Sequence, residues 1–209
     1  MYQPPHFKSK DSAIAADLIR AHPLASLISP DDEGLPFVSH LPLHLKQDGP
    51  HFTLLGHCAK ANPHWRYLRQ RPKAVVTFLG PQAYLSPSIY ADLARVPSWN
   101  YLAVHCTVRA MLIESADAKD ALLKQLIGDH EPAYAQQWRG MEPGLAQQLL
   151  AGIVGFELEV LELQCKLKLN QHRPESHAAL RTMYAAGNAD ERELAKWMDR
   201  LGLGLTKGG

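Results

Sequence analysis

The side chains best suited to chemistry in this sequence lie within residues 51–109. His57, Lys60 and Asn62 follow a strand-like apolar run. A second group joins aromatic and hydrogen-bonding side chains on a proline-rich stretch: Tyr84, Ser86, Trp99 and Asn100. One cation, several hydrogen-bonding groups and exposed aromatic rings at strand ends suit a flat, phosphorylated ligand. We therefore expect a binding site for such a ligand here, although Tyr84, Tyr90 and Trp99 could equally cover the core.

Lys60 is the candidate partner for the ligand's phosphate. It precedes Asn62-Pro63, a pair typical of a helix start, where the first N–H groups lack partners within the helix. An ammonium, open amides and the positive end of the helix dipole together favour an anion. Under this interpretation, Lys60→Ala weakens binding of a phosphorylated ligand by about tenfold to a hundredfold. The alternative is a surface lysine beside an ordinary helix cap.

Two further stretches are candidate walls of the site. The expected strand at 35–45 contains Pro36 and Pro42, and because proline cannot donate to a sheet, it is an edge or bulged strand. Its Ser39-His40-Leu41 piece either offers backbone groups to a ligand or is a plain barrel edge. After the alternating strand 153–163, the chain carries a basic cluster that is either a second wall or a solvated edge: Lys166, Lys168, Gln171, His172 and Arg173.

The elements that must position these residues are mostly strands without regular helical crossovers, which favours an antiparallel barrel in the α+β class. We expect strands at 24–29, 35–45, 51–59, 74–79, 101–113 and 153–163, the last continuing through CKLKLNQHRP. Helices are expected at 11–22, from Asn62-Pro63 to Gln70, at 117–127, after Pro132 and Pro143, and as a pair within about 176–201. Residues 80–100 read as one long loop, and LGLGLTKGG as a frayed tail. The whole chain, 1–209, reads as a single domain.

Composition narrows the classes of protein. A net charge of +1 gives no strong field toward DNA or an anionic membrane. Three widely spaced cysteines, Cys58, Cys106 and Cys165, predict reduced thiols in the cytoplasm rather than disulfides. No signal peptide or membrane span is expected. Motifs for zinc, for a Rossmann or P-loop nucleotide site and for a helix-turn-helix are missing from the sequence, so we expect no metal.

Six short strings together resemble one family, the PaiB-type FMN-binding negative transcriptional regulators. They are MYQPPHF, SHLPL, GHCAKANPHW, AYLSPSIY, VPSWNYLAVH and KLKLNQHRP, in family order over nearly the whole chain. The resemblance implies a split β-barrel with peripheral helices and a C-terminal helical extension, related to pyridoxamine-phosphate oxidases and flavin reductases. It also implies FMN as the cofactor, bound at the interface of a homodimer.

The resemblance also implies roles for individual residues. Ser39, His40 and Leu41 would flank the isoalloxazine, and His57, Lys60 and Asn62 would surround the phosphate or ribityl chain. The pocket would be closed by Tyr84, Ser86, Trp99 and Asn100, and the closing strand would add Lys168, Gln171 and Arg173. The family has serine where Asn170 stands and asparagine where His172 stands, so the resemblance assigns these two positions no role.

Two functions follow from the resemblance. The first is flavin- or redox-linked regulation of transcription, with DNA as a partner although no segment reads as a DNA-binding motif. The second is a flavin-dependent oxidoreductase of the pyridoxamine-phosphate oxidase or flavin reductase class. The sequence shows no obvious general acid or base, and the flavin would supply the difficult chemistry. The sequence therefore leaves open whether the protein is an enzyme.

Overall fold

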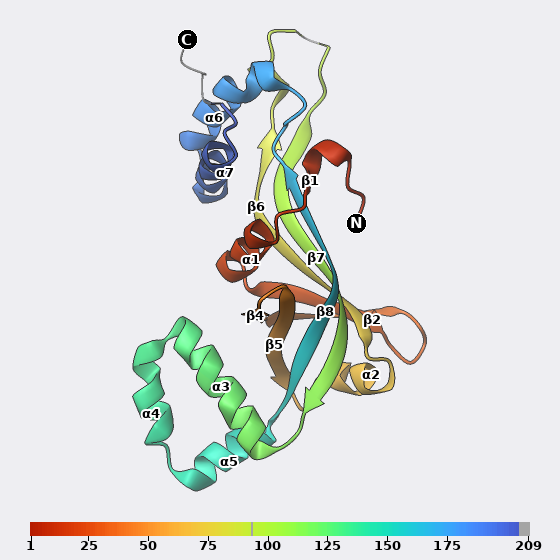
Figure 1. Ribbon diagram of the computed structural model, residues 1–209, viewed down its shortest axis with the longest axis vertical. Helices are drawn as coiled ribbons and strands as arrows, with labels where there is room; N and C mark the ends of the chain where they lie inside the picture. Colours follow the sequence, from red (N-terminus) through yellow and green to blue (C-terminus); the bar gives the residue numbers. More distant parts are fainter. Residues whose placement is uncertain (93, 205–209) are drawn as a thin grey trace. The chain divides into compact units, whose positions relative to one another are not determined.

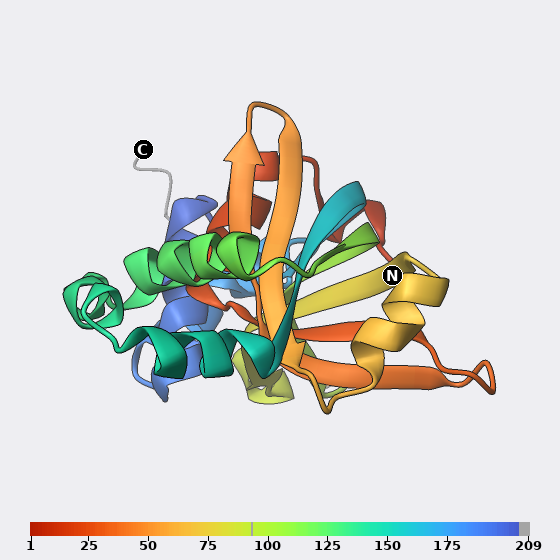
Figure 2. The same cartoon turned by 90° about the horizontal axis from the view of Figure 1, so that it is seen from below.

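The computed structural model describes residues 1–92 and 94–204, and Figures 1 and 2 show it from two directions. Its eight strands form one sheet in the order β3-β2-β6-β7-β8-β5-β4, with β1 paired to β8. The pairings β1–β8, β2–β3, β2–β6, β4–β5 and β5–β8 are all antiparallel. The bounds are β1 Lys8–Ser9, β2 Leu24–Pro30, β3 Pro36–Pro42, β4 His44–Asp48, β5 His51–Ala59, β6 Lys73–Leu85, β7 Ser98–Ile113 and β8 Ile153–Lys168. The predicted α+β class with an antiparallel sheet is confirmed.

The chain divides into two compact units. The terminal unit comprises Met1–Ala21, Leu79–Val104 and the chain from Gln164 onward, and the central unit comprises His22–Phe78 and His105–Leu163. Strands β6, β7 and β8 contribute residues to both units. The single domain expected from the sequence stays a prediction.

The central unit packs its sheet over a core of aliphatic and aromatic side chains. Leu27, Leu54, Phe78, Phe156 and Leu158 are almost completely inaccessible to solvent. The short helix α2 (His64–Gln70) buries Leu68. Between β7 and β8 the chain forms α3 (Ala116–His130), η3 (Pro132–Tyr134), α4 (Ala135–Arg139) and α5 (Pro143–Ala151), with α3 and α5 in contact (Figure 2). The predicted starts at Pro132 and Pro143 are confirmed because proline suits the first position of a helix.

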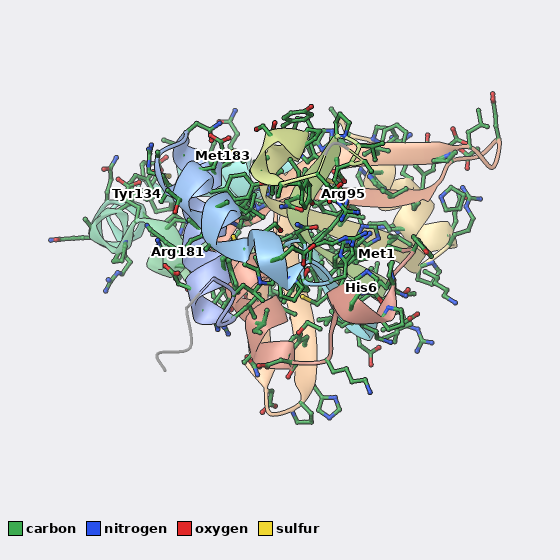
Figure 3. All side chains as sticks on the ribbon, turned by 90° about the horizontal axis from the view of Figure 1, so that it is seen from above. Met1, His6, Arg95, Tyr134, Arg181 and Met183 are labelled. Atoms are coloured by element: carbon green, nitrogen blue, oxygen red, sulfur yellow. The ribbon has the colours of Figure 1, made fainter. Side chains whose placement is uncertain are left out.

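The terminal unit combines strand ends with three α-helices and the short 3₁₀ turns η1 (Pro5–Phe7), η2 (Pro87–Ile89) and η4 (Pro174–Ser176). The helices are α1 (Ser12–Ala21), α6 (His177–Ala185) and α7 (Ala189–Arg200). Helix α7 begins with a capping box formed by Asn188 and Glu191. Arg181, labelled in Figure 3, donates to Asp199 through Nε at 2.5 Å and Nη2 at 2.8 Å, which fastens α6 to α7.

Two expected boundaries are wrong. The predicted loop 80–100 is much shorter, because β6 runs on to Leu85 and β7 begins at Ser98. Gly80 fits inside the strand since a Cβ there would lie only 3.3 Å from the Leu102 carbonyl oxygen and from Leu18 Cδ2. The predicted strand 35–45 is two strands, β3 and β4, separated by Leu43, whose N–H donates to the Pro23 carbonyl instead of to the sheet.

Most other expectations are confirmed. Strand β5 has the predicted bounds, and α1, α6 and α7 lie where expected, whereas β8 continues only to Lys168 and not through residues 169–174. Strand β3 stands at one end of the sheet order, as its two prolines predicted. Of the predicted tail, residues 205–209 lie outside the described part of the chain. Within residues 1–92 and 94–204, no helix has both the length and the apolarity needed to cross a bilayer.

Candidate functional site

In the central unit, three polar side chains of the predicted site meet in the interior. Ser39 Oγ lies 2.8 Å from His64 Nδ1 and accepts from Asn62 Nδ2 at 3.0 Å. The side-chain oxygen of Asn62 accepts the His64 N–H at 3.0 Å, which shapes the turn into α2. Burial lowers the pKa of His64 to about 4, so the imidazole is neutral near pH 7. Ser39 and Asn62 therefore come together as predicted, joined by His64, which the sequence analysis did not assign to the site.

The tripeptide Ser39-His40-Leu41 divides between two faces of the sheet. Successive side chains of a strand point to opposite sides. Ser39 is buried, whereas His40 is exposed and lies across the strand pair from Ser26, with Nδ1 3.1 Å from Ser26 Oγ. Leu41, on the side of Ser39, is half-buried. Ser39 and His40 therefore cannot point together toward one flat ligand.

Several backbone amides near Lys60 already donate hydrogen bonds within the chain. The Lys60 N–H donates to the Gly152 carbonyl at 2.8 Å, and the Asn62 and Arg66 N–H groups donate to Ala59 and Pro63. The Trp65 N–H bonds to the Cys58 sulfur. These bonds occupy several of the amides that the prediction took as open, whereas the Lys60 side chain is exposed.

His57 occupies a half-buried position in β5. Burial lowers its pKa, and its Nδ1 is buried without a hydrogen-bond partner within residues 1–92 and 94–204. In those same ranges no group of three or more histidine, cysteine, aspartate or glutamate side chains is placed to hold a metal ion. His57 is thus a neutral hydrogen-bonding group near pH 7.

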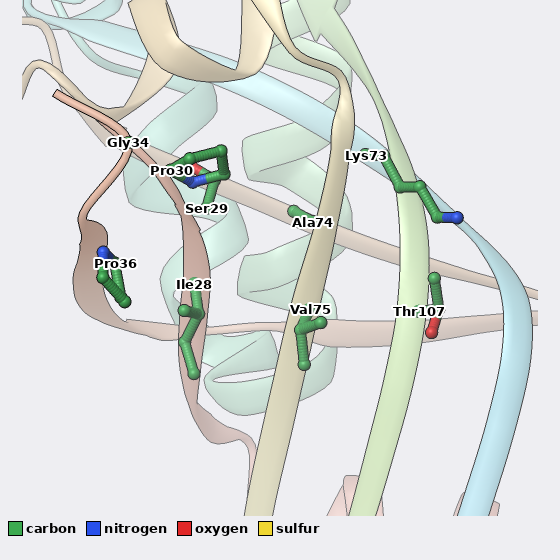
Figure 4. A pocket seen from close by; sticks show the side chains of 9 residues that line it. All are labelled: Ile28, Ser29, Pro30, Gly34, Pro36, Lys73, Ala74, Val75 and Thr107. Carbon is green, nitrogen blue, oxygen red and sulfur yellow. The ribbon is translucent and has the colours of Figure 1, made fainter. Parts of the chain in front are cut away.

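A shallow, mostly apolar hollow of about 360 Å³ lies over β2, β3 and β6 of the central unit (Figure 4). Ile28 pairs with both Val38 and Val75, which places these three aliphatic side chains in one row on one face. Val38 and Val75 are exposed, and Ser29 Oγ is buried without a partner within the described ranges. This face presents apolar surface and offers few groups for chemistry.

The terminal unit holds a cavity of about 260 Å³ that is rich in cations. It is lined by residues from η1, from the β6–β7 connection, from β7 and from the end of β8: Phe7, Leu85, Tyr90, Ala94, Arg95, Val96, Ser98, Asn100, Lys168, Asn170, His172 and Arg173. Among the described residues, no aspartate or glutamate lines it. The cavity thus gathers three positive side chains, Arg95, Lys168 and Arg173, and suits an anion.

Asn100 is the most buried polar residue of this cavity. Its Nδ2 donates to the Tyr184 hydroxyl at 3.0 Å, and its Oδ1 has no partner within the described part of the chain. The Tyr184 hydroxyl in turn donates to the Tyr84 carbonyl at 3.4 Å. A buried amide oxygen without a donor is unfavourable, but Asn100 is completely inaccessible to solvent, so a ligand would reach this oxygen only after a local rearrangement.

The other predicted residues of β6 and β7 lie near the surface. Tyr84 and Trp99 are each about half exposed, with ring centroids 6.0 Å apart, and Trp99 Nε1 donates to Gln82 at 2.9 Å. Ser86 caps η2 by accepting the Ser88 N–H. Tyr84 and Trp99 form an aromatic pair open to a ligand, whereas Ser86 has a structural role in its turn.

The closing-strand residues separate into cavity-lining and structural groups. Lys168 Nζ donates to Ser98 Oγ at 2.9 Å. Burial lowers the pKa of Lys168, Tyr101 opposes this shift, and Lys166 adds a smaller lowering effect. Gln171 bonds back to the backbone of Leu167 and Leu169. Lys168 and Arg173 therefore line the cavity, whereas Gln171 closes its own turn.

The two positions that depart from the family pattern differ in role. Asn170 has φ 64°, a left-handed conformation that asparagine tolerates. Its Nδ2 donates to the hydroxyls of Tyr90 and Ser176. His172 lines the cavity and lies beside His6 and Phe7, and burial lowers its pKa. Asn170 thus holds the turn after β8, while His172 stands at the cavity.

Sequence reasoning missed Arg95. Located in the β6–β7 connection and labelled in Figure 3, it pairs with Asp92 through Nη2 at 2.9 Å and lies 5.5 Å from the Tyr90 ring centroid. Its Nε is buried without a partner within the described ranges. A single arginine in a connecting segment carries no spacing signal, so only the folded chain could identify it.

The predicted site residues fall into both units. Ser39, His40, Leu41, His57, Lys60 and Asn62 belong to the central unit, and Tyr84, Ser86, Trp99, Asn100, Lys168, Gln171 and Arg173 to the terminal unit. Within each unit only some of them converge: Ser39 with Asn62, and Asn100 with Lys168 and Arg173. The predicted roles in cofactor binding stay predictions.

The antiparallel sheet with peripheral helices is the fold of a split barrel. Solved structures with this fold include the FAD and heme binding protein from Mycobacterium smegmatis (20% identity, TM-score 0.59, 77% of this chain and 73% of that chain). The flavocytochrome Anf3 from Azotobacter vinelandii is similar to the same degree (20% identity, TM-score 0.58, 78% of this chain and 69% of that chain).

The chain belongs to the family described as "Putative FMN-binding domain", which matches residues 1–162. It is 30% identical over 206 residues to protease synthase and sporulation protein PAI 2 of Bacillus subtilis (strain 168), covering 95% of this chain and 97% of that protein. The resemblance to the PaiB-type family is therefore confirmed, and FMN is the cofactor of the family.

The residues present fit FMN. The flavin phosphate would need cations, and Arg95, Lys168 and Arg173 line the cavity of the terminal unit. The exposed Tyr84–Trp99 pair offers ring faces to an aromatic ligand. When bound, FMN would supply electron-transfer chemistry, and the part of these side chains would be to hold it.

Proposed function

We propose that this protein binds FMN and regulates transcription in response to the flavin. The observation that carries the proposal is the match to an FMN-binding family over residues 1–162, together with a full-length relative named for two cellular processes. Protease synthesis and sporulation are not single reactions, so a protein named for both is best explained by an effect on the expression of other proteins. The proposal transfers that kind of role to this chain.

The proposal includes FMN contacts from the predicted residues within each unit. The convergent groups support it best, namely Ser39 with Asn62 in the central unit and Asn100 with Lys168 and Arg173 in the terminal unit. Ser86 and Gln171 support it least, because their side chains are used within their own turns. The flavin state would then be communicated to DNA directly or through a protein partner.

The proposal also includes a homodimer. The apolar row of Val38, Ile28 and Val75 supports it, since exposed aliphatic side chains on one sheet face favour association. Twofold dimers are also the commonest soluble assemblies. The second subunit would cover this face.

The test begins with a visible spectrum of the purified protein before and after FMN is added. A flavin absorption band that remains with the protein through gel filtration is the expected result. Binding to DNA from upstream of the protein's own gene is then measured at several salt concentrations, with and without FMN. A flavin-dependent affinity that falls as salt rises supports regulation through DNA. Steady NAD(P)H oxidation without DNA or partner binding would instead establish the oxidoreductase alternative.

A further inference from the structure

A groove of about 520 Å³ lies in the central unit between helix α3 and the strands beneath it. Its walls come from β5, the end of β7, β8 and the first turns of α3. The volume lies within the roughly 300–1,000 Å³ typical of small-molecule sites. Among the described residues, none of those predicted to contact FMN lines the groove. It is therefore a cavity that the proposed function does not use.

The groove arises where a tight helix–strand contact is followed by small side chains. Leu122 of α3 packs in a buried cluster with Leu55. A Cβ on Gly155 would lie only 2.9 Å from Leu122 Cδ2, so this leucine lies directly on the backbone of β8. Ala118 and Ala121, which precede Leu122 on the helix, are exposed and line the groove. Their short side chains leave the space between helix and strands unfilled.

The groove combines aliphatic surface with the carboxylate of Glu157. Met111 is 54% exposed, and Leu55 lies directly across the strand pair from Glu157. The Glu157 side chain is half-buried, and within residues 1–92 and 94–204 it makes no hydrogen bond or ion pair. A carboxylate partly withdrawn from water without a partner is unfavourable. Glu157 therefore favours a ligand that brings a positive charge.

The basic side chains nearby are already paired. Lys119, on the same helix, is buried and donates to the Leu150 carbonyl at 3.0 Å. Arg69 pairs with Glu114 at the edge of the groove. No lysine, arginine or histidine is among the described residues that line it. An anionic ligand would meet the carboxylates of Glu114 and Glu157, and an uncharged one would leave Glu157 unpaired.

The start of α3 borders the groove without making it a site for anions. Ser115 Oγ accepts the Ala118 N–H at 3.3 Å, and the Ser115 carbonyl accepts the Lys119 N–H at 3.1 Å. Asp117 adds a negative charge in this first turn. The positive end of the helix dipole is thus offset by groups of the chain itself.

We infer that this groove binds a small aliphatic amine, with the ammonium group on Glu157 and the hydrocarbon stem along Met111 and Ile113. An ammonium donates charge-assisted hydrogen bonds to a carboxylate. A flexible stem suits the adaptable surface of a methionine side chain. The inference goes beyond the proposed function, because this site requires neither flavin nor DNA.

The experiment follows the Met111 methyl group by NMR in protein labelled at its methionine methyls. Met111→Leu identifies this signal among those of the five methionines. The probes n-hexylamine, n-hexanol and hexanoate are titrated at one pH and salt concentration, because they share a stem and differ in the charge of the head group. Methylammonium tests the charge without the stem.

Three variants accompany the wild type. Glu157→Gln removes the charge and keeps the shape of the side chain. Ala118→Leu extends a side chain into the groove and should block the stem. Glu159→Gln changes an exposed glutamate on the same strand that lies outside the groove lining, so it is the matched control.

We expect n-hexylamine to shift the Met111 signal of the wild type and of Glu159→Gln to saturation. It should bind at least about fivefold more tightly than n-hexanol, because only the amine pairs with Glu157. Glu157→Gln should bind the amine and the alcohol equally, and Ala118→Leu should bind neither. Hexanoate and methylammonium should leave the signal unchanged.

The inference is overturned if n-hexylamine does not move the Met111 signal of the wild type, or if Glu157→Gln binds the amine as tightly as the wild type does. Equal binding of hexanoate and n-hexylamine would also overturn it, since the groove would then recognise the stem alone. Urea unfolding shows whether each variant is folded. If Glu157→Gln does not fold, the comparison of amine with alcohol in the wild type decides the same question.

Discussion

The amide nitrogen of Asn100, in strand β7, donates to the hydroxyl of Tyr184, in helix α6, at 3.0 Å. Both side chains are completely inaccessible to solvent, although 84 positions separate them in the sequence. This bond joins the core of the terminal unit to the wall of its cavity. It therefore links stability to the orientation of a candidate ligand-binding group.

Tyr184→Phe is expected to lower the free energy of unfolding by about 1–3 kcal/mol. The substitution keeps the ring but leaves Asn100 Nδ2 without its acceptor in a buried place. Urea unfolding of the wild type and variant gives the difference. Tyr134→Phe, at a half-buried tyrosine whose hydroxyl bonds to nothing in the described chain, should change stability far less. Equal effects of the two substitutions would contradict the role given to the Asn100–Tyr184 bond.

Lys60→Ala is expected to weaken FMN binding by at most about fivefold. The tenfold to hundredfold loss expected from the sequence relied on open amides, which the fold occupies. An exposed ammonium alone contributes roughly 0–1 kcal/mol. Flavin fluorescence titrations with FMN and riboflavin measure the change. A tenfold or greater loss of affinity for FMN, with the affinity for riboflavin unchanged, would show that Lys60 binds the phosphate.

His64 should make stability depend on pH below neutrality. Burial lowers its folded pKa from 6.5 to about 4, so the unfolded chain takes up the proton first as the pH falls. The contribution of neutral His64 to the free energy of unfolding is complete above pH 6.5 and is lost progressively down to about pH 4. The upper limit of this loss is roughly 3 kcal/mol.

The test compares urea unfolding of the wild type and His64→Gln between pH 4 and 8. Glutamine keeps a hydrogen-bonding group but takes up no proton in this range. The stability difference between the two proteins should therefore shrink as the pH falls. His51→Gln, at an exposed histidine, serves as the control. A difference that is constant across the range would show that His64 is not the titrating group.

The cysteines should be unreactive in the folded protein. All three are buried, and burial raises the pKa of Cys58 to about 11 and that of Cys165 to about 12, so little thiolate exists near pH 8. Mass spectrometry after alkylation should find almost no modification in native buffer and three modified thiols in denaturant without reductant. A Cys58–Cys106 linked peptide from freshly lysed cells would refute the prediction of reduced thiols.

The protein should form a homodimer of twice the 23.2 kDa chain mass. Val75→Glu places a charge in the exposed apolar row of the central unit and should shift light-scattering mass toward the monomer. Lys46→Glu, at an exposed site on β4, should leave the mass unchanged if the apolar row is the interface. A monomeric wild type at micromolar concentration would refute the dimer.

By itself, the sequence determined the elements whose signals are local. A strand-like apolar run defined β5, and apolar alternation defined β8. Pro132 and Pro143 marked helix starts, and Pro36 and Pro42 placed β3 at an edge. These signals depend only on neighbouring residues, because proline lacks a donor and strands alternate their faces. They were sufficient for the fold class and, through six short strings, for the family.

Only the tertiary structure decided what depends on distant partners. Gly80 reads as a chain breaker, yet β6 continues through it because Leu18 and Leu102 close around it. The amides beside Lys60 are occupied because Gly152 and the Cys58 sulfur accept hydrogen bonds from them. The Arg95 side chain is oriented by Asp92 and Tyr90. Contacts between residues far apart in sequence leave no periodic pattern, so the charge and shape of the cavity emerge only when the chain has folded.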